Sequence, residues 1–244
     1  MLVRILSAVF LLPLLLLILL FLPPVYTVVL VAVMAGIASY ELLWGTAFLK
    51  RVRPVIYSSV MAVLVVLWSY FGHQINWIVP GVFCFIILLL AEVMADNENL
   101  SFQQICICLV SGLIIPYMFA SLVRLRGDRG GNILVLVPFL LSFVSDSGAY
   151  FTGVFLGKHK LAPKISPKKT VEGAIGGVII GTLGAIAVAW VYDSFIFPAT
   201  WTHGFGHCGV FVDFKGVIVI GVLATITSMV GDLTFSLIKR SCNV

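Results

Sequence analysis

The chain has 244 residues, of which 61% are hydrophobic and 10% are charged, and its formal net charge is +5. Soluble domains carry about a quarter charged residues, so this composition excludes a soluble enzyme and predicts a polytopic membrane protein. The modest positive charge reflects orientation in the membrane, and we expect no nucleic acid as a partner. The five cysteines form no CxxC pair, so neither a zinc site nor a redox motif is predicted.

Apolar segments recur along the whole chain, and crossing a bilayer takes about 20 apolar residues. The first segment lacks the short core and the small-residue cleavage site of a signal peptide, so we interpret it as a transmembrane helix. The sequence therefore predicts an all-α bundle, with N-terminal transmembrane helices in 1–130 and a catalytic transmembrane region in 131–244. The eight helices are expected at 3–22, 25–49, 55–71, 77–95, 105–125, 132–157, 172–192 and 216–238, of which 55–71 is the shortest.

Lysine and arginine predict the orientation of the bundle, because they are enriched in cytoplasmic loops. With the N-terminus in the cytoplasm, 11 of these residues lie on the inner side and 4 on the outer side. The group Arg124, Arg126 and Arg129 opposes this bias locally. The total favours a cytoplasmic N-terminus.

The expected sixth helix carries a polar face. Ser142, Asp146, Tyr150, Gly153 and Gly157 are three or four residues apart, so they share one side of a helix. A polar face does not favour lipid, and we expect it to face the bundle interior or a water-filled cavity. The alternative is a structural acid paired with a lysine.

The expected seventh helix carries a glycine face. Gly173, Gly177 and Gly181 step by four residues, which lets two helix backbones approach closely. We interpret this face as helix packing that holds the sixth and eighth helices near each other. The same face would also allow a homodimer.

A lysine-rich loop is expected between these two helices, at 158–170. Ser166 or Thr170 is positioned to cap the following helix, with Glu172 in its first turn. A helix N-terminus beside lysines is a favourable phosphate site. The alternative is an ordinary positive-inside loop. The lysines are Lys158, Lys160, Lys164, Lys168 and Lys169.

The expected eighth helix carries a second polar stripe, which runs to the inner surface. Asp146 and Asp232 are the two acids that we expect to be buried in the C-terminal half. Two carboxylates brought together repel unless a cation lies between them. Mg²⁺ prefers oxygen ligands and also binds substrate phosphates, so it is the expected cofactor. The stripe contains Thr225, Ser228, Asp232, Ser236 and Lys239, and Arg240 follows it.

Three motifs resemble those of the phosphatidate cytidylyltransferases, or CDP-diacylglycerol synthases. They are D-S-G-A-Y at 146–150, G-K-H-K-L-A-P-K-I-S-P-K-K-T-V-E-G at 157–173, and G-D-L-x-x-S-x-x-K-R at 231–240. The resemblance covers about residues 135–241. It implies a helical bundle in the bacterial inner membrane, with an active site facing the cytoplasm. The implied reaction converts CTP and phosphatidate to CDP-diacylglycerol and pyrophosphate with Mg²⁺.

The resemblance also implies roles for individual residues. Asp232 matches the metal-binding aspartate of the family, and Lys239 and Arg240 match its basic pair. Together with the analysis of the residues, this gives two groups of candidates. The catalytic candidates are Asp146, Lys168, Lys169, Asp232, Lys239 and Arg240. The substrate-binding candidates are Lys164, Ser166, Thr170, Glu172 and Ser236.

The family signature continues beyond the basic pair into Lys-Asp, His-Gly-Gly and Asp-Arg-x-Asp segments, whereas this sequence ends at Val244. We therefore expect a fragment or a truncated product that inserts in a membrane without catalysing the reaction by itself. The alternatives are a non-catalytic fragment that dimerises through its glycine faces and an ion-coupled transporter. The motif at 157–173 together with that at 231–240 disfavours a related lipid kinase or another nucleotidyltransferase.

Overall fold

The fold is helical almost throughout. A computed structural model describes residues 2–45, 51–72, 77–95, 101–127, 131–163, 165–191 and 214–241. Across these residues, seven helices are long and apolar enough to cross a membrane. The chain is therefore a multi-pass integral membrane protein, and the predicted all-α class is confirmed. It divides into two compact units, Met1–Gly127 (unit 1) and Asp128–Val244 (unit 2).

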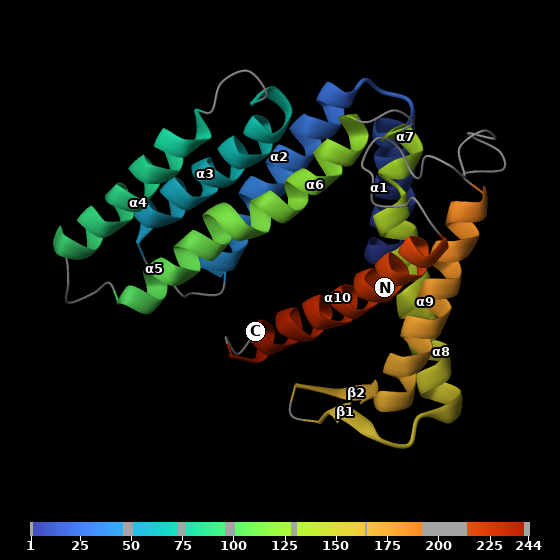
Figure 1. Ribbon diagram of the computed structural model, residues 1–244. Helices are drawn as coiled ribbons and strands as arrows, with labels where there is room; N and C mark the ends of the chain where they lie inside the picture. Colours follow the sequence, from blue (N-terminus) through green and yellow to red (C-terminus); the bar gives the residue numbers. More distant parts are fainter. Residues whose placement is uncertain are drawn as a thin grey trace. The chain divides into compact units, whose positions relative to one another are not determined.

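Unit 1 contains the helices of the N-terminal half (Figure 1). The segment predicted at 55–71 begins earlier, at Val52, and with 20 residues it is long enough to span a bilayer. The helix predicted at 105–125 is longer than expected and includes one π-helical stretch. The elements are α1 (Leu2–Leu20), α2 (Pro24–Tyr40), the π-helix η1 (Glu41–Gly45), α3 (Val52–Phe71), α4 (Ile78–Ala95), α5 (Phe102–Leu109), the π-helix η2 (Val110–Ile114) and α6 (Ile115–Gly127).

Two helix starts in unit 1 have clear local causes. Pro24 opens α2, where its missing N–H is harmless because the first helical N–H groups have no partner within the helix. Ser101 and Gln104 form a capping box at the start of α5. The Gln104 N–H donates to Ser101 Oγ at 3.4 Å, and the Ser101 N–H donates to Gln104 Oε1 at 3.0 Å.

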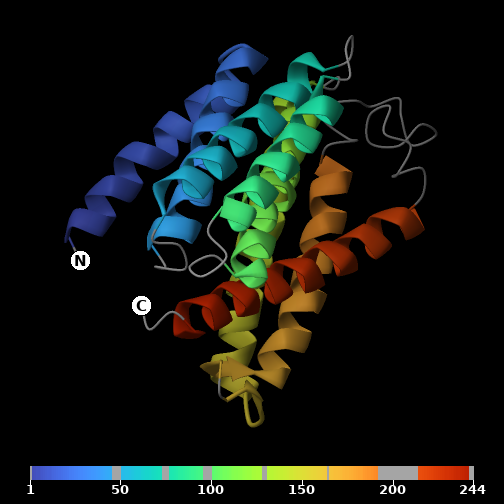
Figure 2. The ribbon, with the colours of Figure 1, turned by 90° about the vertical axis from the view of Figure 1, so that its left-hand side faces the viewer.

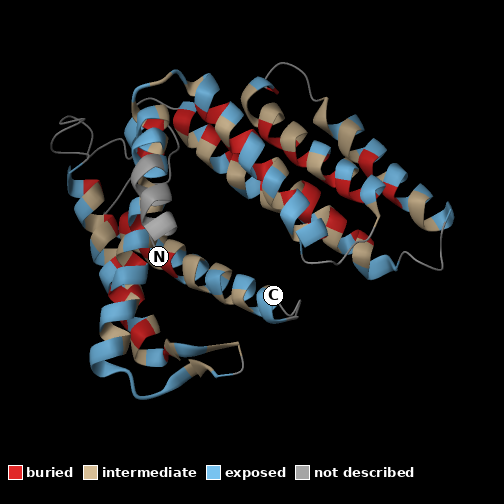
Figure 3. Ribbon diagram, turned by 180° about the vertical axis from the view of Figure 1, so that it is seen from behind, coloured by how far each residue is buried: buried red, intermediate tan, exposed pale blue. Residues whose placement is uncertain are grey.

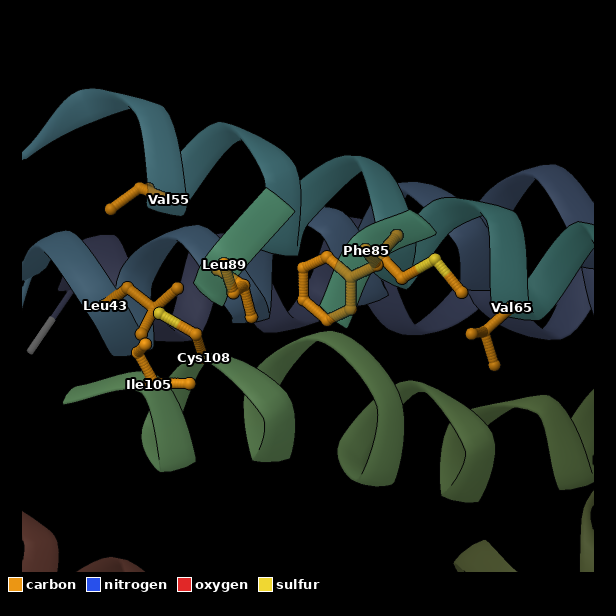
Figure 4. Close-up of a cluster of buried hydrophobic side chains, with 8 residues drawn as sticks. Leu43, Val55, Val65, Phe85, Leu89, Ile105 and Cys108 are labelled. Atoms are coloured by element: carbon orange, nitrogen blue, oxygen red, sulfur yellow. The ribbon is translucent and has the colours of Figure 1, made fainter. Parts of the chain in front are cut away.

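Unit 1 packs around two clusters of buried apolar side chains. One joins α3, α4 and α5 to η1, and Figure 4 shows Leu43, Leu89, Phe85, Ile105 and Cys108 in it. The other joins α2, α3 and α6. Buried residues alternate with exposed ones along the helices (Figure 3). Because the exposed faces keep large apolar side chains, they are suited to contact with lipid.

Unit 2 contains three long helices and a β-hairpin. The helix predicted at 132–157 is interrupted near its start. The prediction of a loop at 158–170 is wrong, because most of this segment forms two antiparallel strands. Lys160 pairs with Thr170, and Ala162 pairs with Ser166 across an irregular register. The elements are α7 (Gly131–Leu134), α8 (Val137–Leu156), β1 (Lys160–Ala162), β2 (Ser166–Thr170), α9 (Val171–Val191) and α10 (Phe214–Ser241).

Glycines allow α8 and α9 to lie side by side, as Figures 1 and 2 show. Gly173, Gly177 and Gly181 are all buried. A Cβ added at Gly173 would lie 2.8 Å from the Ala149 carbonyl oxygen, and one added at Gly177 would lie 2.9 Å from Ala149 Cβ. The predicted close packing by this glycine face is therefore confirmed. α9 also contacts α10, which crosses the pair.

Candidate functional site

A cavity of about 550 Å³ lies within unit 2, between α8, α9, the hairpin and α10. Four charged side chains of the described residues line it. Asp146 comes from α8, Lys168 and Lys169 come from β2, and Asp232 comes from α10. Three separate parts of the sequence thus meet at one site, and Figure 1 shows the elements that bring them there.

The polar face of α8 divides between this cavity and helix packing. Asp146, Tyr150 and Gly153 line the cavity, which confirms that this part of the face meets a cavity. Ser142 lies outside it and exchanges a hydrogen bond of 3.2 Å with Ser228 of α10. Gly157 leaves room for Thr170, since a Cβ added there would lie 2.8 Å from Thr170 Cγ2.

The two carboxylates face one cavity, but neither is buried by packing. Asp146 and Asp232 are both exposed, so the prediction of two buried acids is wrong. They were expected to be buried because they lie within apolar segments, whereas the cavity leaves both side chains open. Asp232 and Lys169 line the same cavity as Asp146, so one negative and one positive side chain share the site with its carboxylate.

Lys169 forms an ion pair with Asp232, in which Lys169 Nζ contacts Asp232 Oδ2. The side chain of Asp232 remains 61% exposed, so this carboxylate keeps room for another ligand. Exposed ion pairs contribute about 0–1 kcal/mol. The pair therefore positions Lys169 across the cavity more than it stabilises the fold.

The hairpin is anchored at its base by Glu172, in the first turn of α9. The carboxylate of Glu172 accepts the Lys158 N–H at 3.1 Å, and Glu172 Oε1 lies 2.6 Å from His159 Nδ1. The Val171 N–H donates to the His159 carbonyl at 2.9 Å. These contacts hold the two ends of the hairpin together. They thereby fix the position of β2, which carries Lys168 and Lys169. Glu172 itself does not line the cavity.

Thr170 caps α9, which confirms one of the two residues that were predicted as the cap of this helix. Its Oγ1 accepts the Gly173 N–H at 3.1 Å, and its side chain is buried. Ser166, the other candidate, pairs with Ala162 within the hairpin. Thr170 also lines the cavity. The cap therefore fixes the start of α9 at the wall of the site.

The other site candidates lie apart from the cavity. Ser236, Lys239 and Arg240 follow Asp232 on α10, and Lys239 and Arg240 are exposed on its last turn. None of the three lines the cavity, and neither does Ser166. Lys164 lies outside the residues that the structure describes.

Sequence reasoning missed the apolar wall of the site and its anchor. Val154, Leu161 and Met229 line the cavity beside the charged residues, and nothing distinguishes them from other apolar residues in such a sequence. The contact between His159 and Glu172 spans 13 residues. It is a tertiary contact with no periodic signal, although both residues lie in the G-K-H-K to V-E-G motif.

The cavity suits a ligand that is anionic on one side and apolar on the other. Its carboxylates can hold a divalent cation, because Mg²⁺ typically binds through one or two carboxylates plus water and substrate phosphates. Within the described residues, no group of three or more His, Cys, Asp or Glu side chains forms a metal cluster. Asp146 and Asp232 are the two carboxylates among the described residues of the cavity that could hold such a cation.

The chain belongs to the family described as the Cytidylyltransferase family, whose profile matches residues 2–244. It is similar to curated proteins named phosphatidate cytidylyltransferase. The one from Staphylococcus haemolyticus is 29% identical over 169 residues, which cover 68% of this chain and 64% of that protein. The one from Haemophilus influenzae is 36% identical over 137 residues, covering 54% and 43%. The one from Staphylococcus saprophyticus is 31% identical over 157 residues, covering 64% and 54%. The matched chain thus spans 43% to 64% of the length of these relatives, and the resemblance inferred from the three motifs is confirmed.

Proposed function

We propose that this protein transfers a cytidylyl group from CTP to phosphatidate and releases pyrophosphate. The observation that carries the proposal is the unit 2 cavity, where two carboxylates and two lysines meet beside an apolar wall. Membership of the cytidylyltransferase family and similarity to proteins named phosphatidate cytidylyltransferase support it.

In the proposed reaction, a phosphate oxygen of phosphatidate attacks the α-phosphorus of CTP. A new P–O–P bond forms, the bond to the β-phosphate breaks, and pyrophosphate leaves with its electron pair. Phosphatidate is already an anion near neutral pH, so no strong base is needed. The barrier lies in bringing two polyanions together, and positioning and positive charge lower it.

The cavity residues supply these two contributions. Lys168 and Lys169 place two positive charges on one wall, where they neutralise phosphate oxygens. Asp146 and Asp232 on the other elements would hold Mg²⁺, which when bound supplies further charge neutralisation to the CTP phosphates. Lys239 and Arg240 lie about 10 Å beyond Asp232 along α10 and extend the positive charge toward the membrane surface.

The apolar wall fits a lipid substrate. Val154 is 62% exposed and Tyr150 is 67% exposed, and both line the cavity next to Asp146. Burying the acyl chains of phosphatidate against such side chains keeps the lipid in the membrane while its phosphate reaches the lysines. The lysines of the hairpin favour the cytoplasmic side. We therefore propose an active site that faces the cytoplasm, in a bacterial inner membrane.

The substitution Asp232→Asn tests the proposal, because it keeps the size of the side chain and removes its charge. The chain is reconstituted in vesicles that contain phosphatidate, and labelled CTP is added with Mg²⁺. Two quantities are measured: CTP retained on the vesicles and label that enters the lipid fraction. We expect Mg²⁺-dependent retention by the unmodified chain and its loss in Asp232→Asn.

Glu41→Gln is the matched control, since Glu41 is an exposed acid of unit 1, outside the cavity. It should leave CTP retention unchanged. Unaltered CTP retention and label transfer in Asp232→Asn at ordinary Mg²⁺ would refute the metal assignment. Failure of the unmodified chain to retain CTP at any Mg²⁺ concentration would refute the proposed substrate.

A further inference from the structure

Lys169 and Asp232 each have two competing partners in the unit 2 cavity. The structure pairs Lys169 Nζ with Asp232 Oδ2, whereas the proposed reaction uses Asp232 for a divalent cation and Lys169 for a phosphate. A cation on Asp232 Oδ2 would meet the ammonium at contact distance, and two positive charges that close repel each other. Both roles can therefore be filled only if Lys169 changes its contact.

The charges of the cavity favour such a change when a polyanion binds. Among the described residues that line it, Asp146 and Asp232 carry two negative charges, and Lys168 and Lys169 carry two positive charges. These charges cancel, so a free cation finds no net attraction while Lys169 stays on Asp232. The phosphates of a nucleotide bring new negative charge for the lysines, and the carboxylates then become available to a cation.

The ion pair is weak enough to be exchanged. The side chain of Asp232 is 61% exposed, and that of Lys169 is 27% exposed. An exposed pair of this kind contributes at most about fivefold to an equilibrium constant. The ammonium of a lysine is a compact charge on a flexible stem, so it can turn to another anion nearby.

The main chain at Lys169 is fixed, so the exchange is confined to the side chain. The next residue, Thr170, is buried, and its Oγ1 accepts the Gly173 N–H at 3.1 Å. Thr170 also pairs with Lys160 across the hairpin. With a volume of about 550 Å³, the cavity leaves room for the Lys169 side chain to turn.

We propose that Lys169 holds the place of the cation on Asp232 until a nucleotide binds. A phosphate then draws the ammonium away from Asp232 Oδ2, and the freed carboxylate takes the cation. Cation and nucleotide therefore bind cooperatively, and each raises the affinity for the other by the same factor. The nucleotide step rests on the proposed function, whereas the competition between Lys169 and a cation is tested without any nucleotide.

Cation binding without nucleotide is the first test. The chain is purified in a neutral detergent free of lipid, and free Mn²⁺, which prefers the same oxygen ligands as Mg²⁺, is measured by electron paramagnetic resonance. We expect Lys169→Gln to lower the dissociation constant for Mn²⁺ about two- to fivefold, the factor by which an exposed ion pair competes. Lys169→Arg keeps the charge and should bind Mn²⁺ no more tightly than the unmodified chain.

Lys160→Gln is the matched control, because Lys160 is an exposed lysine of the same hairpin that does not line the cavity. It removes the same charge and should leave the dissociation constant for Mn²⁺ unchanged. Asp232→Asn should raise this constant with either lysine or glutamine at residue 169. No tightening by Lys169→Gln, or an equal tightening by Lys160→Gln, would overturn the exchange.

Retention of CTP on vesicles should respond in the opposite direction. Lys169→Gln should lower it severalfold, since the same ammonium meets a phosphate once it leaves Asp232. Failure of the unmodified chain to retain CTP would overturn the proposed function and with it the nucleotide step. Retention of CTP together with an unchanged Mn²⁺ constant in Lys169→Gln would overturn the exchange alone.

Chemical labelling follows Lys169 in the unmodified chain, so it does not depend on how well a variant folds. An amine that is paired with a carboxylate is acetylated slowly by an N-hydroxysuccinimide ester, and fragment masses separate Lys169 from Lys168. We expect saturating Mg²⁺ to accelerate acetylation of Lys169 up to about fivefold, CTP with Mg²⁺ to slow it again, and neither to affect Lys160. Acetylation of Lys169 at the same rate with and without Mg²⁺ would overturn the exchange.

Discussion

Substitution of Gly173 should force α8 and α9 apart, by an amount that the structure lets us estimate. A Cβ at this position would lie 2.8 Å from the Ala149 carbonyl oxygen and 3.2 Å from Gly153 Cα. The first distance is about 0.6 Å short of ordinary contact, and both neighbours are backbone atoms that cannot rotate away. Overpacking of this kind costs about 1–3 kcal/mol. Alanine recovers about 1 kcal/mol of helix propensity relative to glycine.

Two substitutions of increasing size therefore give a graded expectation. Gly173→Ala should lower the free energy of unfolding by about 1 kcal/mol, and Gly173→Val by about 2–3 kcal/mol, because valine adds two methyl groups and recovers less helix propensity. Gly81→Ala and Gly81→Val are matched controls, since a Cβ at Gly81 meets nothing within 4 Å. Both controls should be neutral or slightly stabilising.

The assay is reversible unfolding in mixed micelles, followed by circular dichroism as the fraction of sodium dodecyl sulfate rises. Its midpoint should fall in the order glycine, alanine, valine at residue 173 and should stay level at residue 81. Mg²⁺-dependent CTP retention should fall along the same series, since separation of α8 from α9 displaces Thr170 and β2 from the cavity. Unfolding of Gly173→Val at the same midpoint as the unmodified chain would show that the two helices do not meet at this residue.

Three smaller perturbations have defined outcomes in the same unit. Thr170→Val removes the cap on α9 and should cost about 1 kcal/mol in the micelle titration, with Thr170→Ser restoring most of it; equal midpoints for both variants would contradict the cap. Glu172→Gln keeps the size of the side chain but removes the charge beside His159. Hydrogen exchange of the backbone amides of Lys158 and His159, measured by mass spectrometry, should therefore become faster. Unchanged exchange would show that another contact anchors the hairpin. Ser142→Ala should cost only about 0.6 kcal/mol, the average for hydrogen bonds between membrane helices; a cost larger than that of Thr170→Val would mean that this contact is the main attachment of α10.

The polar and glycine faces of unit 2 could be predicted, because such residues in a membrane helix favour contact with other helices or with a cavity over contact with lipid. A carboxylate and a row of glycines both disfavour lipid, so the spacing of Asp146 with Tyr150 identified the side of α8 that lines the cavity, and that of Gly173 with Gly177 identified the side of α9 that packs against α8. Spacing cannot say which helices meet. The convergence of Asp146 and Asp232 depends on how α10 crosses α8 and α9, which is a property of the packed unit.

The hairpin could not be predicted, because its residues lack the alternation of a strand in a sheet with one buried face. It contains Pro163 and Pro167, which usually argue against a strand. A two-stranded hairpin has only edge positions, so a proline can face outward without breaking the pairing. What holds the hairpin is Glu172 from the next helix, which accepts two backbone N–H groups from Lys158 and His159.

Arg126, near the end of α6, has a consequence for the order in which unit 1 assembles. Arg126 is buried and donates to the carbonyl of Leu22 at 2.7 Å, a contact that closes the turn between α1 and α2. The two residues are 104 positions apart in the chain. At a synthesis rate of about 5–20 residues per second, Arg126 emerges from the ribosome roughly 5–20 s after Leu22. Until then, the Leu22 carbonyl must accept a hydrogen bond from water or from a lipid headgroup. The pair of helices α1 and α2 is therefore synthesised well before this hydrogen bond can form, because the bond waits for α6, which ends the fourth of the seven candidate membrane spans.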